Sequence, residues 1–413
     1  MQIWLINHYA VPTRYYPLAR PAAFAKYLMR AGHEVTIFAA STVHNARLNL
    51  ITDGSLYKED TVDGIHYVYV RDIDYAGNGI SRILNMLLFP PRLGRVCGRF
   101  PRPDVILSVS ATPMACMKGL KLAKKYGCRG VAEIADLWPE SFVAYGLVNP
   151  RNPLLKLLYA YEKRLYTSAS AIVFTMEGGR DYIAGKGWEA GRGGPLDMGK
   201  VYHINNGVDL EAFDGDRERY AFADPDLDAP DTFKVVYTGA IRKANDLSVL
   251  VDTAETLQRL GRDRIVLLLY GDGDERAALE QEAGRRSLRN IVFKGKVDKH
   301  AIPSVLSRAD LCLLHWKPTP IEKYGMSMNK QFDYFASGKP ILANAKTAYD
   351  LIGRYAGGSA QSLPDADAYA AAICRFADMD AGKRQEYGRN ARKAAEDYDF
   401  AKLTEKLMRV MGI

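Results

Sequence analysis

The stretch KYGMSMNKQFDYFASGKPILAN, residues 323–344, contains the pattern that decides the fold. A glycine-containing turn leads into a helical segment, which ends at Ser-Gly-Lys-Pro before a short apolar strand. Gly325, Lys330 and Asp333 all lie close to the start of this helix. A lysine beside the free amides of a helix N-terminus favours an anionic ligand. The stretch therefore predicts a ligand-binding turn in an α/β domain.

Short apolar strands alternate with helical patterns on both sides of this stretch, as helices predicted at 23–32 and 114–127 illustrate. In the first half we predict strands at 3–7, 33–41, 64–70, 104–110, 129–135 and 170–176. In the second half we predict strands at 200–207, 233–239, 264–271, 290–295, 309–315 and 339–344. Strands separated by helices indicate βαβ units, so the chain should form two parallel sheets in sequence.

The length of 413 residues also favours two domains, because one hydrophobic core rarely extends so far. We place the boundary near Asn205–Asp209, which gives an N-terminal domain of residues 1–205 and a C-terminal domain of residues 206–398. The amphipathic helix predicted at 399–413 either closes the second domain or crosses back to the first.

The composition of the chain indicates the cellular compartment and the class of binding partner. The first residues are expected to form a strand rather than a signal peptide, and no apolar run is long enough to span a membrane. Five cysteines without CxxC spacing indicate a reduced, cytoplasmic setting and no structural zinc. The net charge of +8 favours an anionic partner. Nucleic acid is disfavoured because the basic residues are spread along the chain without an aromatic-rich block.

Several strands of the second half end in glycine: Gly239, Gly271 with Gly273, and Gly295. Ligands of open α/β sheets bind at the carboxyl ends of strands, where glycine lets a backbone approach a phosphate closely. The alternative, that each glycine simply ends its strand, stays open for any single position. Together with the turn before Lys330, the three strand ends predict one ligand cleft.

The ordered motifs resemble glycosyltransferase family 4 over nearly the whole chain. They are AGHEVTIFAAS, DLWPES and HINNGVDLEAF in the first half, and YTGAIRKANDLSVLVDTAETL, LLLYGDGDERAALEQEA, LRNIVFKGKVDKHAIPSVLSRADLCLL and NKQFDYFASGKPILAN in the second. They are most similar to bacterial enzymes of surface-polysaccharide synthesis, including an N-acetylfucosamine transferase branch. The resemblance implies a GT-B fold, in which two Rossmann-like domains face a cleft and the C-terminal one holds the nucleotide sugar.

The resemblance also implies roles in donor binding. Asp333 stands at the second acid of the family's E-x7-E motif, which binds the ribose hydroxyls, while Gly325 stands where the first acid is usual. Arg242 and Lys243 follow the position of the family's arginine, which is Ala240 here. Arg242, Lys243 and Lys330 are therefore the expected cations for the leaving diphosphate. Further donor contacts are expected at Arg20, Gly239, Gly271, Gly273, Phe293, Lys294, Ser327, Met328 and Asn329.

The first domain should bind the acceptor. Asp136 is the expected contact to the reacting sugar or acceptor hydroxyl, although Ala135 replaces a histidine that many relatives carry beside it. Glu140 and His8 are further candidates on the acceptor side. The alternative for Asp136 is an acid that caps or braces the Trp-Pro-Glu turn.

Residues 79–103 combine the apolar run ILNMLLF with five arginines. Apolar residues flanked by cations suit contact with an anionic membrane surface, and Leu84, Leu87, Leu88 and Phe89 are the expected inserting residues. The alternative is a helix facing the core, followed by a solvated basic loop.

These observations predict a cytoplasmic, membrane-peripheral, retaining glycosyltransferase at the inner face of the cell membrane. Its donor should be a UDP-sugar and its acceptor lipid-linked or a saccharide, in surface-polysaccharide synthesis. We expect no metal and no cofactor, because the scattered D-x-D triplets match chance and the cations can serve the diphosphate. Two other hypotheses are a nucleotide-sugar epimerase of the same fold and a nucleotide-sugar-binding module without catalysis.

Overall fold

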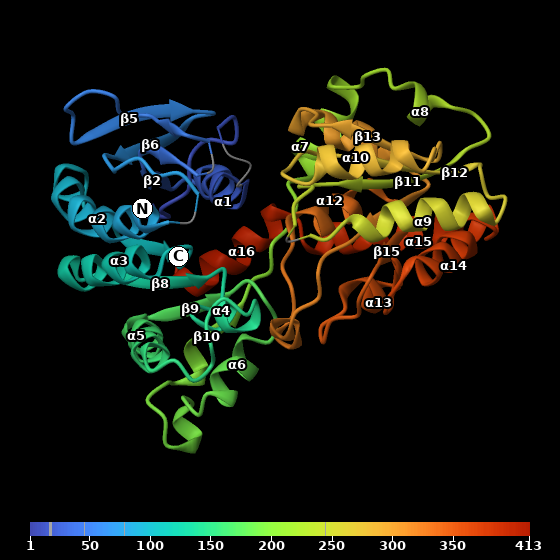
Figure 1. Cartoon of the computed structure of the whole chain (residues 1–413). Coiled ribbons are helices and arrows are strands. Elements are labelled where there is room, and N and C mark those ends of the chain that lie inside the picture. Colours follow the sequence, from blue (N-terminus) through green and yellow to red (C-terminus); the bar gives the residue numbers. More distant parts are fainter. Residues whose placement is uncertain (16–18, 45, 78, 244) are drawn as a thin grey trace. The chain divides into compact units, whose positions relative to one another are not determined.

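A computed structural model describes residues 1–15, 19–44, 46–77, 79–243 and 245–413 (Figure 1). The chain divides into two compact units. The first comprises Met1–Asn205 with Phe400–Ile413, and the second comprises Asn206–Asp399. Across the described ranges, no helix has the length and apolar character needed to cross a membrane.

The first unit is built on a sheet whose eight strands, within the described residues, run in the order β10-β9-β8-β7-β1-β2-β6-β5. Neighbours are parallel except that β5 pairs antiparallel with β6. The strand order reverses between β1 and β7, which makes this pair the topological switch point. The strands are β1 (Gln2–Ile6), β2 (Glu34–Ala40), β5 (Tyr57–Val62), β6 (Ile65–Val70), β7 (Val105–Val109), β8 (Arg129–Ile134), β9 (Ala171–Phe174) and β10 (Val201–His203). A small hairpin, β3 (Thr42–Val43) with β4 (Leu48–Asn49), follows β2.

Helices α2 (Ile80–Val96), α3 (Pro113–Tyr126) and α5 (Leu154–Ser168) form one layer on this sheet (Figure 1). Helices α2, α3 and α5 lead to β7, β8 and β9, which follow one another in the same direction across the sheet. Because crossovers between parallel strands are right-handed, all three helices must lie on the same face of the sheet. The inner sides of α2 and α3 pack on Trp4, Ile6 and Phe38 in a core that is closed to solvent. The short helices α4 (Glu140–Ala144) and α6 (Gly179–Gly185) lie in the connections around β9.

The C-terminal helix α16 (Phe400–Met411) belongs to the first unit. It packs against α1 (Ala19–Arg30), with the rings of Phe400 and Phe24 at 5.4 Å between centroids. Arg129 at the start of β8 donates a 2.9 Å hydrogen bond to the Val410 carbonyl. These contacts answer the question that the sequence left open about the last helix.

The second unit contains a parallel sheet, described as six strands in the order β13-β12-β11-β14-β15-β16. Its switch point lies between β11 and β14. The strands are β11 (Phe233–Thr238), β12 (Ile265–Tyr270), β13 (Ile291–Gly295), β14 (Leu311–Leu314), β15 (Ile341–Ala343) and β16 (Gly358–Ala360). The helices are α7 (Leu210–Arg219), α8 (Pro225–Asp228), α9 (Ser248–Arg259), α10 (Arg276–Arg285), α11 (Ile302–Ser307), α12 (Asn329–Ser337), α13 (Leu351–Tyr355), α14 (Ala366–Ala377) and α15 (Ala381–Asp397).

The antiparallel edge strand β5 was not among the predicted strands. It carries charged residues on an exposed edge, so it lacks the apolar run that marks the other strands. The turn that joins it to β6 is Asp63-Gly64, with φ of 54° and 78°. Asp-Gly between two extended segments is a strong hairpin signal, and this signal was available in the sequence.

The predicted membrane segment is corrected in one respect. Phe89, which we expected to insert into a bilayer, is fully buried in the core together with Leu93. Of the other expected residues, Leu84 and Leu87 are exposed and Leu88 is half-buried, and Ile80 and Ile83 are exposed on the same helix. The helix is therefore amphipathic: one side faces the core, as the alternative predicted, and contact of the other side with a membrane stays a prediction.

The packing of α16 gives a stability prediction. Leu407 is fully buried, so Leu407→Ala should lower the unfolding free energy by about 2–5 kcal/mol. The exposed Lys406 on the same helix is the control, and Lys406→Ala should change it by less than about 0.5 kcal/mol. Urea unfolding monitored by tryptophan fluorescence measures both. Equal midpoints for the two variants would show that the helix does not stabilise the fold.

Candidate functional site

Three loops lie together at the carboxyl ends of β11, β12 and β13. The Gly239 amide donates a 2.9 Å hydrogen bond to the Tyr270 carbonyl, and the Gly271 amide donates a 2.8 Å bond to the Gly295 carbonyl. A Cβ atom on Gly271 would lie 1.7 Å from the Gly239 carbonyl oxygen. Gly271 is therefore required for the loops to pack on each other, a reason independent of any ligand.

Helix α12 is anchored to the end of β11 beside these loops. The Tyr334 hydroxyl accepts a 2.8 Å hydrogen bond from the Thr238 amide. Met328 occupies the N-cap position, and no side-chain hydrogen bond caps the helix. The first amides of α12 therefore keep their capacity to bind an anion.

The ammonium group of Lys330 lies between these elements. Its Nζ donates a 3.0 Å hydrogen bond to the Tyr237 hydroxyl and sits 4.4 Å from the centre of the Tyr237 ring. A Cβ built on Gly239 would be 3.1 Å from the same Nζ, so Lys330 adjoins the β11 loop. Among the described side chains, no carboxylate lies within ion-pair distance of this lysine. Burial lowers the pKa of Lys330 to about 8.

Asp333 lies one turn after Lys330 on α12 and is half-buried. Burial raises the pKa of its carboxyl group to about 6, while the charge of Lys299 acts in the opposite direction. Arg242 and Lys243 are exposed in the loop after β11. The structure therefore gathers Gly239, Lys330 and this loop at the switch point of the second unit.

The turn before α12 has its own fixed geometry. Gly325 ends a short 3-10 helix, Pro320–Tyr324, with φ of 87°, a conformation that favours glycine. The nearby Glu322 is part of a capping box with Thr319 and is not placed at the site. Ser327 accepts a 2.9 Å hydrogen bond from the Asn206 amide, and Asn329 contacts the Asn206 side chain.

Two predicted donor residues have other partners. Lys294 forms ion pairs with Asp224 at 2.6 Å and Asp226 at 2.5 Å. The Phe293 side chain packs in the core of the second unit. Their predicted donor contacts stay untested, but these interactions account for both residues without a ligand.

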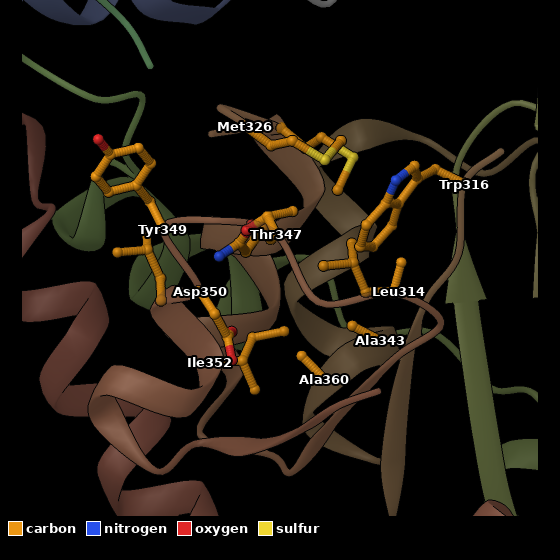
Figure 2. A pocket seen from close by; sticks show the side chains of 13 residues that line it. Leu314, Trp316, Met326, Ala343, Thr347, Tyr349, Asp350, Ile352 and Ala360 are labelled. Atoms are coloured by element: carbon orange, nitrogen blue, oxygen red, sulfur yellow. The ribbon is translucent and has the colours of Figure 1, made fainter. Parts of the chain in front are cut away.

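A small pocket lies next to the turn that contains Met326 and Met328 (Figure 2). Figure 2 shows Met326 and Trp316 close together at one side of it. Gln331, Thr347, Tyr349 and Asp350 supply polar atoms, and the other lining residues are apolar apart from the indole N–H of Trp316. The indole N–H of Trp316 is buried and has no hydrogen-bond partner in the structure.

In the first unit, Asp136 follows β8 and is exposed. Glu140, four residues later, forms a 2.6 Å ion pair with Lys186 and accepts a 2.6 Å hydrogen bond from the Tyr159 hydroxyl. Glu140 therefore braces the segment after β8, while the exposed Asp136 remains the stronger candidate for contact with an acceptor.

Arg20 and His8 are both buried. The guanidinium of Arg20 donates to the Glu133 carboxylate at 2.9 and 3.0 Å and to the carbonyls of Ile204 and Asn205 at 2.9 and 2.6 Å. His8 hydrogen-bonds to Asn85 at 2.7 Å, and burial lowers its pKa to about 4. The predicted phosphate contact of Arg20 and acceptor contact of His8 stay untested.

Sequence reasoning missed several polar groups at the two switch points. Tyr237 holds Lys330, and its hydroxyl also donates a 3.0 Å bond to the Ala240 carbonyl. In the first unit, the hydroxyls of Ser110 and Thr112 follow β7 and are buried without hydrogen-bond partners. Their place after a switch-point strand was the available signal. Within the described ranges, no group of three or more His, Cys, Asp or Glu side chains is arranged to hold a metal ion.

Comparison with known proteins assigns both halves of the chain. Residues 22–212 match the family described as Glycosyltransferase Family 4, and residues 232–379 match Glycosyl transferases group 1. The chain is composed of two glycosyltransferase domains. Each matched region falls largely within one structural unit.

The relatives of this glycosyltransferase support the fold. The colanic acid biosynthesis glycosyl transferase WcaI of Escherichia coli (strain K12) is 26% identical over 222 residues, and the match spans about half of each chain. Anabaena Alr3699/HepE in complex with UDP and glucose is 14% identical, with a TM-score of 0.64 and coverage of 100% and 99%. An E. coli structure described as trehalose-6-phosphate bound with UDP-2-fluoro glucose is 12% identical, with a TM-score of 0.71 and the same coverage. The glycosyltransferase has the GT-B fold that the resemblance implied.

The pKa values of Lys330 and Asp333 predict how UDP binding depends on pH. Affinity should be highest between about 6 and about 8. Below this window Asp333 gains a proton and loses an acceptor for the ribose; above it Lys330 loses its proton and its charge. Calorimetric titration with UDP across this range measures the profile.

Three variants make the test specific. Lys330→Arg keeps its charge at high pH, so its UDP affinity should not decline at alkaline pH. Asp333→Asn has no carboxyl group to protonate at this position, so it should lose the part of the acid decline in affinity that Asp333 causes. Lys323→Met, on an exposed lysine of the same segment, should keep the wild-type profile. An unchanged alkaline decline in Lys330→Arg would remove Lys330 from the site.

Proposed function

We propose that this glycosyltransferase moves a sugar from a UDP-sugar donor to a saccharide or lipid-linked acceptor in polysaccharide synthesis, with retention of anomeric configuration. The observation that carries the proposal is the Lys330 ammonium, held beside Gly239 at the N-terminus of α12 without a carboxylate among the described side chains. A half-buried cation of this kind is stabilised by a bound anion. UDP in the HepE complex and the UDP-sugar analogue in the E. coli structure support the choice of anion.

The same cation has a role in the reaction. The bond between the anomeric carbon and the diphosphate oxygen breaks, its electron pair stays on the diphosphate, and the acceptor hydroxyl oxygen forms the new bond while its proton is released. Negative charge grows on the diphosphate in this step, so fixed positive charge there stabilises the transition state by a few kcal/mol per well-placed donor. Lys330 supplies this charge from a rigid helix, and Arg242 and Lys243 supply it from an exposed loop.

The pocket of Figure 2 has a free volume of about 10 Å³, so it can take a small group of the transferred sugar, such as a methyl group, and not the whole sugar. It adjoins the Met326–Met328 turn, and Leu314, Trp316 and the methionines form the apolar part of its lining. Apolar walls favour methyl groups, such as those of an N-acetylated deoxy sugar, over additional hydroxyls. The unpaired Trp316 N–H can donate to a carbonyl or hydroxyl oxygen of the same sugar.

The acceptor is assigned to the first unit, where the exposed Asp136 is the candidate contact to the acceptor hydroxyl or reacting sugar. The name of the E. coli relative refers to colanic acid biosynthesis, which supports a role in polysaccharide synthesis. The five cysteines are free, which fits action in the reducing cytoplasm.

Incubation of the purified protein with a panel of UDP-sugars, with and without acceptors, tests the proposal. Transfer should require an acceptor, and the product should keep the donor's anomeric configuration by NMR. Epimerisation without an acceptor would support the epimerase, and UDP-sugar binding without any turnover would support the binding module.

Two variants test the roles that we assign to the two units. Asp333→Ala should weaken UDP binding more than turnover, since ribose contacts are similar in the ground and transition states. Asp136→Asn should lower kcat and leave UDP affinity unchanged. A reversal of these two effects would exchange the roles that we assign.

The absence of a metal requirement is tested separately. Because protein cations are assigned to the diphosphate, activity should persist in excess EDTA. Activity that is lost in EDTA and recovered on addition of magnesium would contradict this assignment.

A further inference from the structure

The helix layer α2–α3–α5 of the first unit has an uneven distribution of charge. These helices contain ten lysines and arginines, three on α2, four on α3 and three on α5, and Glu162 is their single acid. Their net charge of +9 exceeds the +8 of the whole chain. The rest of the protein is therefore almost neutral, and its positive charge is concentrated in one layer.

The acid of this layer does not offset the cations at the surface. Glu162 is buried, and its carboxylate accepts hydrogen bonds from the hydroxyls of Tyr166 at 2.6 Å and Tyr182 at 2.7 Å. By contrast, many of the cations are exposed and have no ion pair among the described residues. These exposed cations are Arg95, Lys121, Lys124, Lys125, Lys156 and Arg164.

Apolar side chains are exposed on the two outer helices of the same layer. On α2 they are Ile80, Ile83, Leu84 and Leu87, spaced as one helical stripe. On α5 they are Leu154, Leu157 and Leu158. The leucines of α5 were not singled out by sequence analysis, because nothing in that helix distinguishes its exposed side from its core side by composition.

The topology of the sheet determines where the apolar and the cationic side chains lie along these helices. Helices α2, α3 and α5 each join parallel strands, so they run in one direction and begin at the edge where the strands end. The apolar residues lie in the first halves of α2 and α5, whereas Lys121, Lys124 and Lys125 lie in the second half of α3. The layer therefore has an apolar band toward the strand ends, where Asp136 lies, and its exposed cations other than Lys156 lie behind this band.

We propose that the α2–α3–α5 layer binds the surface of a membrane that contains anionic lipids. Leucine and isoleucine side chains at the start of α2 and α5 enter the interfacial region, and the lysines of α3 contact lipid phosphates. The charge of the layer favours an anionic membrane as its partner. The three helices expose cations, which an anionic surface complements, and they expose no carboxylate that could pair with cations of another partner. Contact in this manner turns the strand ends, with Asp136, toward the bilayer.

Vesicle sedimentation with the full chain tests the proposal. The protein should bind vesicles that mix phosphatidylcholine with phosphatidylglycerol, bind vesicles of phosphatidylcholine alone much more weakly, and dissociate at high salt. Lys121→Ala/Lys124→Ala/Lys125→Ala should reduce partitioning about a hundredfold at low salt, since each cation near an anionic surface contributes on the order of fivefold.

Matched control variants test whether membrane binding depends on this face or only on the net charge of the protein. Lys58→Ala/Arg389→Ala/Lys393→Ala removes three exposed cations elsewhere and should retain most of the binding. Equal loss in the two triple variants would overturn the assignment of the face. Leu84→Gln/Leu87→Gln and Leu154→Gln/Leu157→Gln should each weaken binding at every salt concentration, because they act on the apolar band.

Two measurements distinguish membrane binding from misfolding and from self-association. UDP affinity and the thermal melting curve should be unchanged in every variant, because the changed residues are exposed and the donor site is assigned to the second unit. Light scattering without lipid should show the same mass for wild type and the leucine variants. A wild-type dimer that the leucine variants dissociate, without vesicle binding by wild type, would assign the face to a second copy of the chain and overturn the proposal.

Discussion

The donor site that we propose depends on one half-buried cation, Lys330. The ammonium of Lys330 is held by the hydroxyl and ring of Tyr237, at 3.0 and 4.4 Å, and no described carboxylate neutralises it. Tyr237 is the penultimate residue of β11, and Lys330 is the second residue of α12. The contact therefore joins the strand at the switch point to the helix whose N-terminal amides are uncapped. The strand, the helix and the cation meet at one place, which is where we propose that the anionic donor binds.

The scaffold around this cation is made by backbone contacts. The loops after β11, β12 and β13 are joined by hydrogen bonds between main-chain groups, and a Cβ on Gly271 or Gly273 would strike the neighbouring loop within 2.1 Å. His315 after β14 adds a 2.9 Å bond to the Asp246 carbonyl, which ties the β11 loop across the switch point. The loops that meet a ligand are therefore set by the sheet and do not rely on their exposed side chains.

The sequence was sufficient for the fold class, because alternating apolar strands and helices leave few arrangements other than two parallel sheets, and the ordered motifs identify the GT-B type. It failed at β5, whose charged residues hide an edge strand, and at Phe89, because an apolar run does not reveal which side of a helix faces the core. The position of α16 also needed the structure, since an amphipathic helix can cover either sheet. For the site, sequence pattern brought Gly239 and Lys330 to one place but did not reveal Tyr237, whose role depends on a contact between residues 93 positions apart.

The interaction partners of each cation indicate whether it stabilises the fold or is available to bind a ligand. Arg20 has a carboxylate and two carbonyls as partners, and those carbonyls belong to Ile204 and Asn205, the last residues of the first unit before the chain enters the second. Lys294 is likewise neutralised by two aspartates. Both residues resemble Lys330 in sequence terms, as cations near a strand end or helix start. Because a cation with its own carboxylate gains less from a phosphate, we propose Lys330 as the cation that meets the donor, while the donor contacts predicted for Arg20 and Lys294 stay untested.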